Sequence, residues 1–118
     1  MKLAIVGSRT FYGYNKMKSF ISENYNIDDI TCIISGGAKG ADSLAERFAM
    51  EFCKELKVFP ADWKKYGKRA GFLRNVDIIT ECDECVAFWD GESHGTRHDI
   101  ELCEMMGKKC KICKFDKI

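Results

Sequence analysis

The sequence predicts an α/β fold: a Rossmann-like, doubly wound sheet of five parallel strands flanked by helices. Five short apolar runs, at 3–6, 31–34, 56–59, 85–89 and 110–115, alternate with longer amphipathic stretches. These runs are nearly all apolar rather than alternating, which is typical of strands covered on both faces. Since 118 residues suffice for one small core, we expect a single domain over residues 1–118.

The amphipathic stretches predict four helices, at about 14–23, from 39–42 to 55, 67–81 and 96–106. The second has the broadest apolar stripe, formed by Leu44, Ala45, Phe48, Ala49 and Phe52. Gly107 follows the fourth stretch and is expected to end that helix. The order of the strands does not follow from the sequence, but the order 3-2-1-4-5 would place the first and fourth strands side by side.

Composition and charge exclude several classes of protein. The chain is 46% hydrophobic and 31% charged, as in an ordinary soluble globule. Nineteen basic and eighteen acidic residues give a net charge of +1, so we do not expect nucleic acid as a partner. No apolar run approaches the roughly 18–20 residues of a membrane span, and the start is too short for a signal peptide. We therefore expect a cytoplasmic protein with no membrane contact.

The seven cysteines are expected to be reduced and buried, because their number is odd and no secretory signal is present. Two pairs, Cys82-x-x-Cys85 and Cys110-x-x-Cys113, have the spacing of a four-thiolate zinc site. Residues three apart in an extended strand point to opposite faces, so Cys110 and Cys113 should diverge. We expect neither a metal nor a cofactor, with structural zinc as the alternative.

The glycine-rich segment 36–42, Gly-Gly-Ala-Lys-Gly-Ala-Asp, lies between an apolar run and a helix-like stretch. Such a turn directs backbone N–H groups toward one point, where a phosphate is favoured. Two further turns, 7–9 and 91–96, also follow apolar runs, and the carboxyl ends of parallel strands meet at one edge. These turns predict one shared pocket. The alternative is a helix-entry turn capped by Ser35 or Asp42.

Two other segments bear polar groups suited to a nucleotide. In 90–99, Asp90 could accept hydrogen bonds from ribose hydroxyls, and His94 or His98 could act chemically. The alternative is that Thr96 caps the helix, with Asp99 completing a capping box. The segment 60–75 mixes cations with aromatic rings. It predicts either a nucleic-acid surface or a pocket wall, with Trp63 or Tyr66 against a base and Arg69 or Arg74 on a phosphate, and the neutral total charge favours the pocket.

The motifs at 7–11, 35–42, 60–63, 67–75 and 87–96 together resemble the YspA/YpsA-related branch of the SLOG superfamily, whose Rossmann-like domains are related to DprA and to the LOG phosphoribohydrolases. The resemblance implies a five-stranded parallel sheet and a pocket for a nucleotide or nucleotide-derived ligand. The LOG enzymes use a Gly-Thr-x-Glu-Glu helix start. This chain has Gly95-Thr96 but His98 and Asp99 at the two glutamate positions, which leaves hydrolysis open.

We therefore predict a protein that binds an ADP-ribose or nucleoside-monophosphate type ligand at the carboxyl ends of the strands, as a stand-alone sensor or sequestering protein and as a homo-oligomer. The predicted ligand-binding residues are Gly7, Ser8, Arg9, Gly36, Gly37, Ala38, Lys39, Gly40, Asp42, Arg69, Arg74, Asn75, Asp90, Ser93, Gly95 and Thr96. The first alternative is an N-glycosidic hydrolase of nucleoside monophosphates, with Asp99 or Glu101 as the catalytic carboxylate. The second is a DprA-like binder of single-stranded nucleic acid.

Overall fold

Five parallel strands form one sheet in the order β3-β2-β1-β4-β5. In this computed structural model, which describes residues 1–116, the strands are β1 (Lys2–Gly7), β2 (Cys32–Ser35), β3 (Glu55–Val58), β4 (Glu84–Trp89) and β5 (Lys109–Lys114). The fold class is the predicted one. Since β1 and β4 are hydrogen-bonded neighbours, the chain reverses its winding direction between them, and their carboxyl ends border the usual ligand crevice of such sheets.

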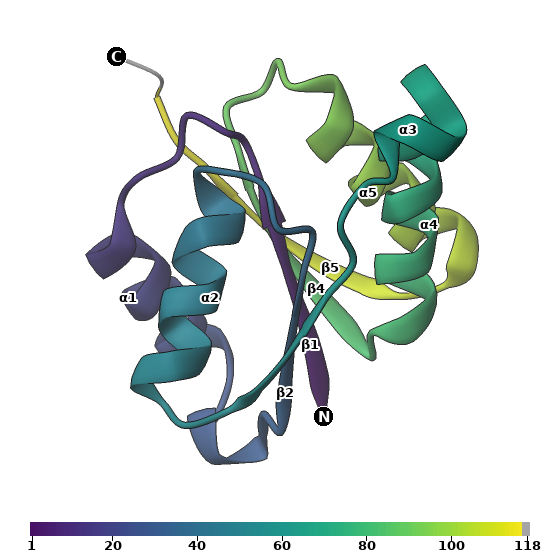
Figure 1. Ribbon diagram of the computed structural model, residues 1–118. Coiled ribbons are helices and arrows are strands. Elements are labelled where there is room, and N and C mark those ends of the chain that lie inside the picture. The colour runs from purple at the N-terminus through teal and green to yellow at the C-terminus, as the bar shows by residue number, and fades with distance from the viewer. Residues whose placement is uncertain (117–118) are drawn as a thin grey trace.

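Helices cover both faces of the sheet (Figure 1). On one face lie α1 (Tyr14–Asn24) and α2 (Ala41–Glu51), and on the other lie α3 (Trp63–Tyr66), α4 (Ala70–Glu81) and α5 (His94–Met106). Two short 3₁₀ turns, Ile27–Asp29 and Gly67–Arg69, complete the helical elements of the described residues. This two-sided covering explains why the strands read as continuous apolar runs.

Strand β1 shows how the core divides. Leu3 and Ile5 belong to the buried cluster beneath α1 and α2, whereas Ala4 and Val6 belong to the cluster beneath α4 and α5. The edge strand β3 differs, because all four of its residues are exposed, Leu56 by 41% and Val58 by 36%. The expectation that every strand is covered on both faces is therefore wrong for β3.

The helix boundaries differ from those predicted at three places. Helix α2 ends at Glu51 rather than near 55, because Cys53 adopts a left-handed φ of 55° and the chain enters β3. The predicted helix 67–81 is α4 preceded by separate short turns, since Gly67 has a φ of 58°. Helix α5 begins at His94 rather than near 96, so Thr96 lies inside its first turn and the alternative in which Thr96 caps the helix is wrong. Gly107 ends α5 in the left-handed conformation, as predicted.

Candidate functional site

A cavity of about 460 Å³ opens at the carboxyl ends of β1 and β4, between the starts of α2 and α5 and the side of α4. Pockets of this size suit small organic ligands. Twelve of the residues predicted for binding or catalysis line it: Gly7, Ser8, Arg9, Ala38, Asp42, Arg74, Asn75, Asp90, Ser93, Gly95, Thr96 and Asp99. The predicted shared pocket is therefore present as a geometric feature.

The turn after β4 is held to the turn after β1 through Ser8. The Ser8 N–H donates to the Phe88 carbonyl at 2.9 Å, and the Ser8 hydroxyl accepts from the N–H of Asp90 at 3.3 Å. Asp90 organises its own turn, because its Oδ1 accepts from the N–H groups of Glu92 and Ser93 at 2.8 Å each. The Ser93 hydroxyl donates to Ser8 Oγ at 2.9 Å. These polar groups build the wall of the cavity and fix its shape.

The glycine-rich turn before α2 directs backbone N–H groups into the protein. Three of them donate internally: Gly37 to Ser35 Oγ at 3.3 Å, Ala38 to Asp42 Oδ2 at 3.1 Å, and Ala41 to the Ser8 carbonyl at 3.2 Å. The residue before the helix is Gly40, and no side chain caps it there within the described chain. Ser35 and Asp42 therefore stabilise the turn rather than capping the helix.

Glycines in these turns allow close packing between elements. A Cβ on Gly7 would lie 2.5 Å from the Phe88 carbonyl oxygen. At Gly40, where φ is 75°, it would lie 2.4 Å from the carbonyl oxygen of Arg9. A Cβ on Gly36 would lie 2.6 Å from an Arg74 nitrogen. The predicted ligand-binding residues Gly36, Gly37, Lys39 and Gly40 are not among the residues that line the cavity.

The start of α5 faces the cavity directly. His94, Gly95 and Thr96 all line it, and no side-chain cap closes the N-terminus at Ser93 within the described residues. A Cβ added to Gly95 would meet no atom within 4 Å, so the space beside this residue is open. A helix of 13 residues carries partial positive charge at this end.

A hydrogen-bonded chain crosses the cavity floor from the α2 turn to α5. Arg74 Nη1 donates to the Gly36 carbonyl at 2.8 Å, and Arg74 Nε donates to Asn75 Oδ1 at 3.1 Å. Asn75 Nδ2 then donates to the Gly95 carbonyl at 3.3 Å and lies 3.2 Å from His98 Nδ1. Burial lowers the pKa of His98, which favours the neutral ring. This chain sets the positions of both helix starts.

Two buried carboxyl groups, Asp42 and Asp99, also line the cavity. Burial raises the pKa of Asp42, opposed by the Ala38 N–H and the Arg74 guanidinium. Burial and the nearby Asp42 raise the pKa of Asp99 well above its usual value, again opposed by Arg74. Asp99 Oδ1 is the buried side-chain oxygen or nitrogen left without a hydrogen-bond partner among the described residues. It can therefore accept from, or when protonated donate to, a bound molecule.

The outer wall of the cavity consists of exposed cations and aromatic rings. Arg9 and Lys68 line it, together with Trp63 and Phe72, each of which is 53% exposed. The sequence predicted Arg69 or Arg74 as the cation of segment 60–75. Arg74 lines the cavity and Arg69 does not, and Lys68 and Phe72, which also line it, were not predicted. The helical period of α4 could have identified the side of α4 that faces the cavity, because Gly71, Asn75 and Ile78 recur at helical spacing and all line the cavity.

The predicted catalytic carboxylates have different positions. Asp99 is buried in the cavity wall, whereas Glu101 is exposed on α5 and is not part of the lining. His94 lines the cavity, whereas His98 lies behind it, with its ring 4.6 Å from that of Phe72. Of the two predicted carboxylates, Asp99 is the one in reach of a cavity ligand.

Comparison with known proteins identifies the family. The model of the YspA, cpYpsA-related SLOG family matches residues 1–66, more than half of the chain, and the chain belongs to this family. Over 81 residues it is 41% identical to the Gene 61 protein of Mycobacterium phage D29, covering 64% of this chain and 65% of the phage protein. A solved structure of DNA processing protein A from Helicobacter pylori, described for its single-stranded DNA binding mode, has the same fold. Its TM-score is 0.70 at 20% identity, covering 95% of this chain and 64% of that one.

These findings correct one prediction. We did not expect nucleic acid as a partner, but the Helicobacter protein of this fold binds single-stranded DNA, so net charge alone does not exclude it. The chain spans less than two thirds of the length of both relatives. No helix among residues 1–116 is long and apolar enough to cross a membrane. The predicted homo-oligomer stays a prediction.

Proposed function

We propose that this protein binds a nucleotide-type ligand in the cavity, with a phosphate at the start of α5. The observation that carries the proposal is the convergence on one cavity of an uncapped helix N-terminus, three cationic side chains and two exposed aromatic rings. Phosphate, ribose and base each need one of these kinds of partner.

The phosphate is assigned to α5 rather than to the glycine-rich turn before α2. In the α2 turn, N–H groups already donate to protein oxygens, whereas the backbone at Gly95 is open to the cavity. Arg9 and Lys68 line the same cavity and can approach the phosphate from the solvent side. Arg74 contributes its charge from a fixed position, because it is held by Gly36 and Asn75.

The base is assigned to the exposed aromatic rings of the outer wall, and the ribose to Asp99 on α5. Trp63 and Phe72 offer exposed ring faces to a base, and stacking on an aromatic ring contributes about 1–3 kcal/mol per base. Asp99 Oδ1, buried and without a protein partner, is suited to a ribose hydroxyl. Binding without turnover would make the protein a sensor or a sequestering protein.

A ligand panel with two matched variants tests the proposal. Thermal unfolding is followed with AMP, ADP-ribose, NAD, a cyclic nucleotide and inorganic phosphate, because a ligand of the native state raises the melting temperature. Trp63→Ala should weaken nucleotide binding about tenfold or more, while Tyr66→Ala should not change it. Both rings are exposed on α3, but only Trp63 lines the cavity. Absence of a shift with every nucleotide would reject the proposal.

Single-stranded nucleic acid is a second candidate ligand, favoured by the fold shared with the Helicobacter DNA processing protein. A strand lying across the cavity mouth would contact α3, whose Lys64, Lys65 and Tyr66 are exposed. In that case Tyr66→Ala and Lys64→Ala weaken binding of a labelled oligonucleotide, and the affinity falls steeply with salt. A mononucleotide that competes with the oligonucleotide would place both ligands in the cavity.

Hydrolysis of an N-glycosidic bond is the third candidate, favoured by the buried, unpartnered Asp99 in the cavity. A carboxylate there could stabilise an oxocarbenium-like transition state or activate water. Chromatography of nucleoside monophosphates after incubation with the protein detects a released base. Asp99→Asn should abolish that release and Glu101→Gln should not, since Glu101 is outside the lining.

A further inference from the structure

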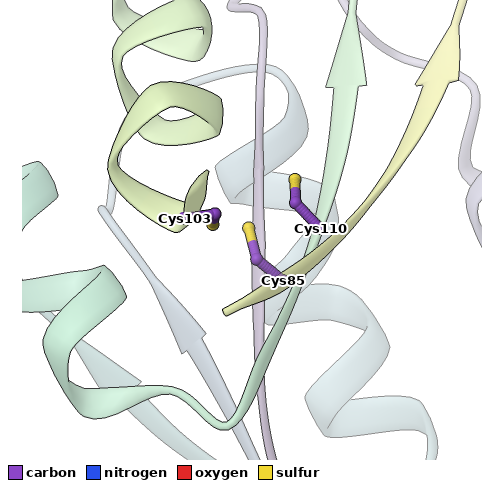
Figure 2. Close-up of side chains that lie close together, drawn as sticks. All are labelled: Cys85, Cys103 and Cys110. Atoms are coloured by element: carbon purple, nitrogen blue, oxygen red, sulfur yellow. The ribbon is translucent and has the colours of Figure 1, made fainter. Parts of the chain in front are cut away.

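Three cysteines from three different elements gather beneath the cavity, on the α4 and α5 side of the sheet (Figure 2). Cys85 on β4 and Cys110 on β5 are register partners in adjacent parallel strands, so their side chains share one face. Cys103 on α5 packs against that face, and the three sulfur atoms lie within 4.8 Å of one another. Cys85 and Cys110 lie in strands of six residues, and Cys103 lies in a helix of 13 residues.

This cluster contains one cysteine of each Cys-x-x-Cys pair, and the other cysteine of each pair lies outside it. Cys113 belongs to the hydrophobic cluster beneath α1 and α2, so Cys110 and Cys113 diverge as predicted. The Cys82 thiol donates to the Ile79 carbonyl at 3.4 Å at the end of α4. The two pairs therefore do not form a four-thiolate site, and Cys103, which has no motif around it, completes the cluster.

We propose that Cys85, Cys103 and Cys110 form a binding site for one thiophilic metal ion, with Zn²⁺ as the physiological candidate. Zinc–sulfur bonds of about 2.3 Å require sulfur atoms about 3.8–4.0 Å apart around a shared ion. The sulfur atoms lie within 4.8 Å of one another, so small side-chain rotations that move each sulfur by less than about 1 Å would bring all three to bonding distance of one ion. Soft thiolate ligands without nitrogen or oxygen select zinc, copper(I) and similar ions over magnesium or calcium.

The surroundings suit such an ion. Cys85 and Cys103 are fully buried, while Cys110 is half-buried and provides a route from solvent. Cysteine binds metal as the thiolate, so all three thiols release their protons to solvent as three metal–sulfur bonds form. With three protein ligands, zinc retains one position for water on the Cys110 side.

Metal in this position would join α5 to β4 and β5. The same helix lines the ligand cavity with its first turn, and Asp99 lies one turn before Cys103 on the same face. The ion would therefore hold the start of α5 in place by fixing its middle. This inference does not depend on the identity of the cavity ligand.

The test is metal binding by the full chain, reduced and freed of metal. Zn²⁺ is added, unbound ion is removed by dialysis, and elemental analysis gives the metal content. Cd²⁺ serves as a reporter, because cadmium–thiolate bonds absorb in the ultraviolet. We expect one ion per chain and an increase in melting temperature on the order of 10 °C at a hundredfold excess over Kd.

Variants then assign the ligands. Cys110→Ser should weaken metal binding by about tenfold or more and remove one third of the cadmium–thiolate absorbance. Two control variants should leave metal affinity and cadmium–thiolate absorbance unchanged. They are Cys113→Ser, from the same Cys-x-x-Cys pair, and Cys53→Ser, at an exposed position. Cys103→Ser tests the helix ligand; if it does not fold, the half-buried Cys110→Ser decides alone. A wild-type chain that retains no metal, or an equal loss in Cys113→Ser, overturns the proposal.

Discussion

The glycine-bearing turn before α2 and the one before α5 look alike in sequence but differ in what their backbones face. The α2 turn closes on itself, because Ser35 and Asp42 accept from the N–H groups of Gly37 and Ala38. At the α5 turn, Asp90 accepts from the residues before the helix, and the first helical turn lines the cavity. Glycine content therefore does not distinguish the two turns, and the proposal that a phosphate binds at α5 rests on the partners of the N–H groups and on the cavity lining.

The two turns also use glycine differently. Gly40 has a left-handed φ and touches the backbone of Arg9, so a side chain there conflicts with the fold. Gly95 lies in a helix with open space beside it, so a side chain there conflicts only with a ligand. One turn supports the architecture and the other lines the cavity in which we propose that the ligand binds, and five predictions test this division.

The largest expected effect is on folding. Gly40→Ala should lower the free energy of unfolding by about 3 kcal/mol or more, because the new Cβ meets the Arg9 backbone in a strained conformation. Urea unfolding measures it. Gly13→Ala is the control, since its Cβ would make only ordinary contacts of 3.5 Å. Equal stability of the two variants would remove the packing role assigned to Gly40.

Arg74→Met should lower the free energy of unfolding by about 2–3 kcal/mol, because it leaves the Gly36 carbonyl and Asn75 Oδ1 without a charged donor. Arg74 also opposes the rise in pKa of Asp42 and Asp99, because its charge favours their ionised forms. The loss of stability should therefore be larger near pH 7 than near pH 4, where the carboxyl groups take up protons. Urea unfolding at the two pH values checks this. Lys39→Met, an exposed change in the same turn, should have little effect at either.

Asp99→Asn should raise the free energy of unfolding by about 1–2 kcal/mol near pH 7. Burial and Asp42 raise the pKa of Asp99 above its usual 3.8, so the folded protein disfavours the ionised carboxylate. That cost is absent below pH 3.8 and develops as pH rises through the raised pKa. The stabilisation should therefore vanish in acid. A variant less stable than wild type near neutral pH would mean that Asp99 has a stabilising partner.

Gly95→Ala should weaken nucleotide binding about tenfold, or about 1.4 kcal/mol, while stability stays the same or rises by up to about 1 kcal/mol. The reason is that alanine favours the helix but places a methyl group where the proposed phosphate approaches. Calorimetric titration and urea unfolding give the two quantities. If binding is unchanged, the phosphate does not lie at the start of α5.

The smallest effect concerns the outer cations. Lys68→Ala should weaken nucleotide binding roughly threefold at low salt and less at high salt, because an exposed lysine acts through a screened charge. Lys64→Ala removes the same charge four positions earlier, outside the cavity lining, and should have a smaller effect. Titrations at two salt concentrations compare them. Identical losses would indicate general attraction by the basic segment 64–69 rather than contact in the cavity.

Much of this could be predicted because it depends on local pattern. Apolar runs and amphipathic stretches located every strand and the main helices, and turns at strand ends pointed to the right edge of the sheet. Local pattern did not show that α2 stops at Glu51, because that depends on the unusual backbone of Cys53. Nor did it predict α3, because the predicted helix 67–81 starts after Tyr66 and includes the separate 3₁₀ turn that begins at Gly67.

The sequence by itself determined the alternation of strands and helices, the two-sided burial of the central strands and the set of polar turns from which a site is built. These follow from the periods of 2.0 and 3.6 residues, which need no knowledge of distant contacts. Only the tertiary structure decided which N–H groups of the turns donate to protein oxygens, that Lys68 rather than Arg69 lines the cavity, and that Cys103 joins Cys85 and Cys110. The physical reason is that strand order and helix rotation set the meeting of residues far apart in the chain, and no local spacing encodes either one.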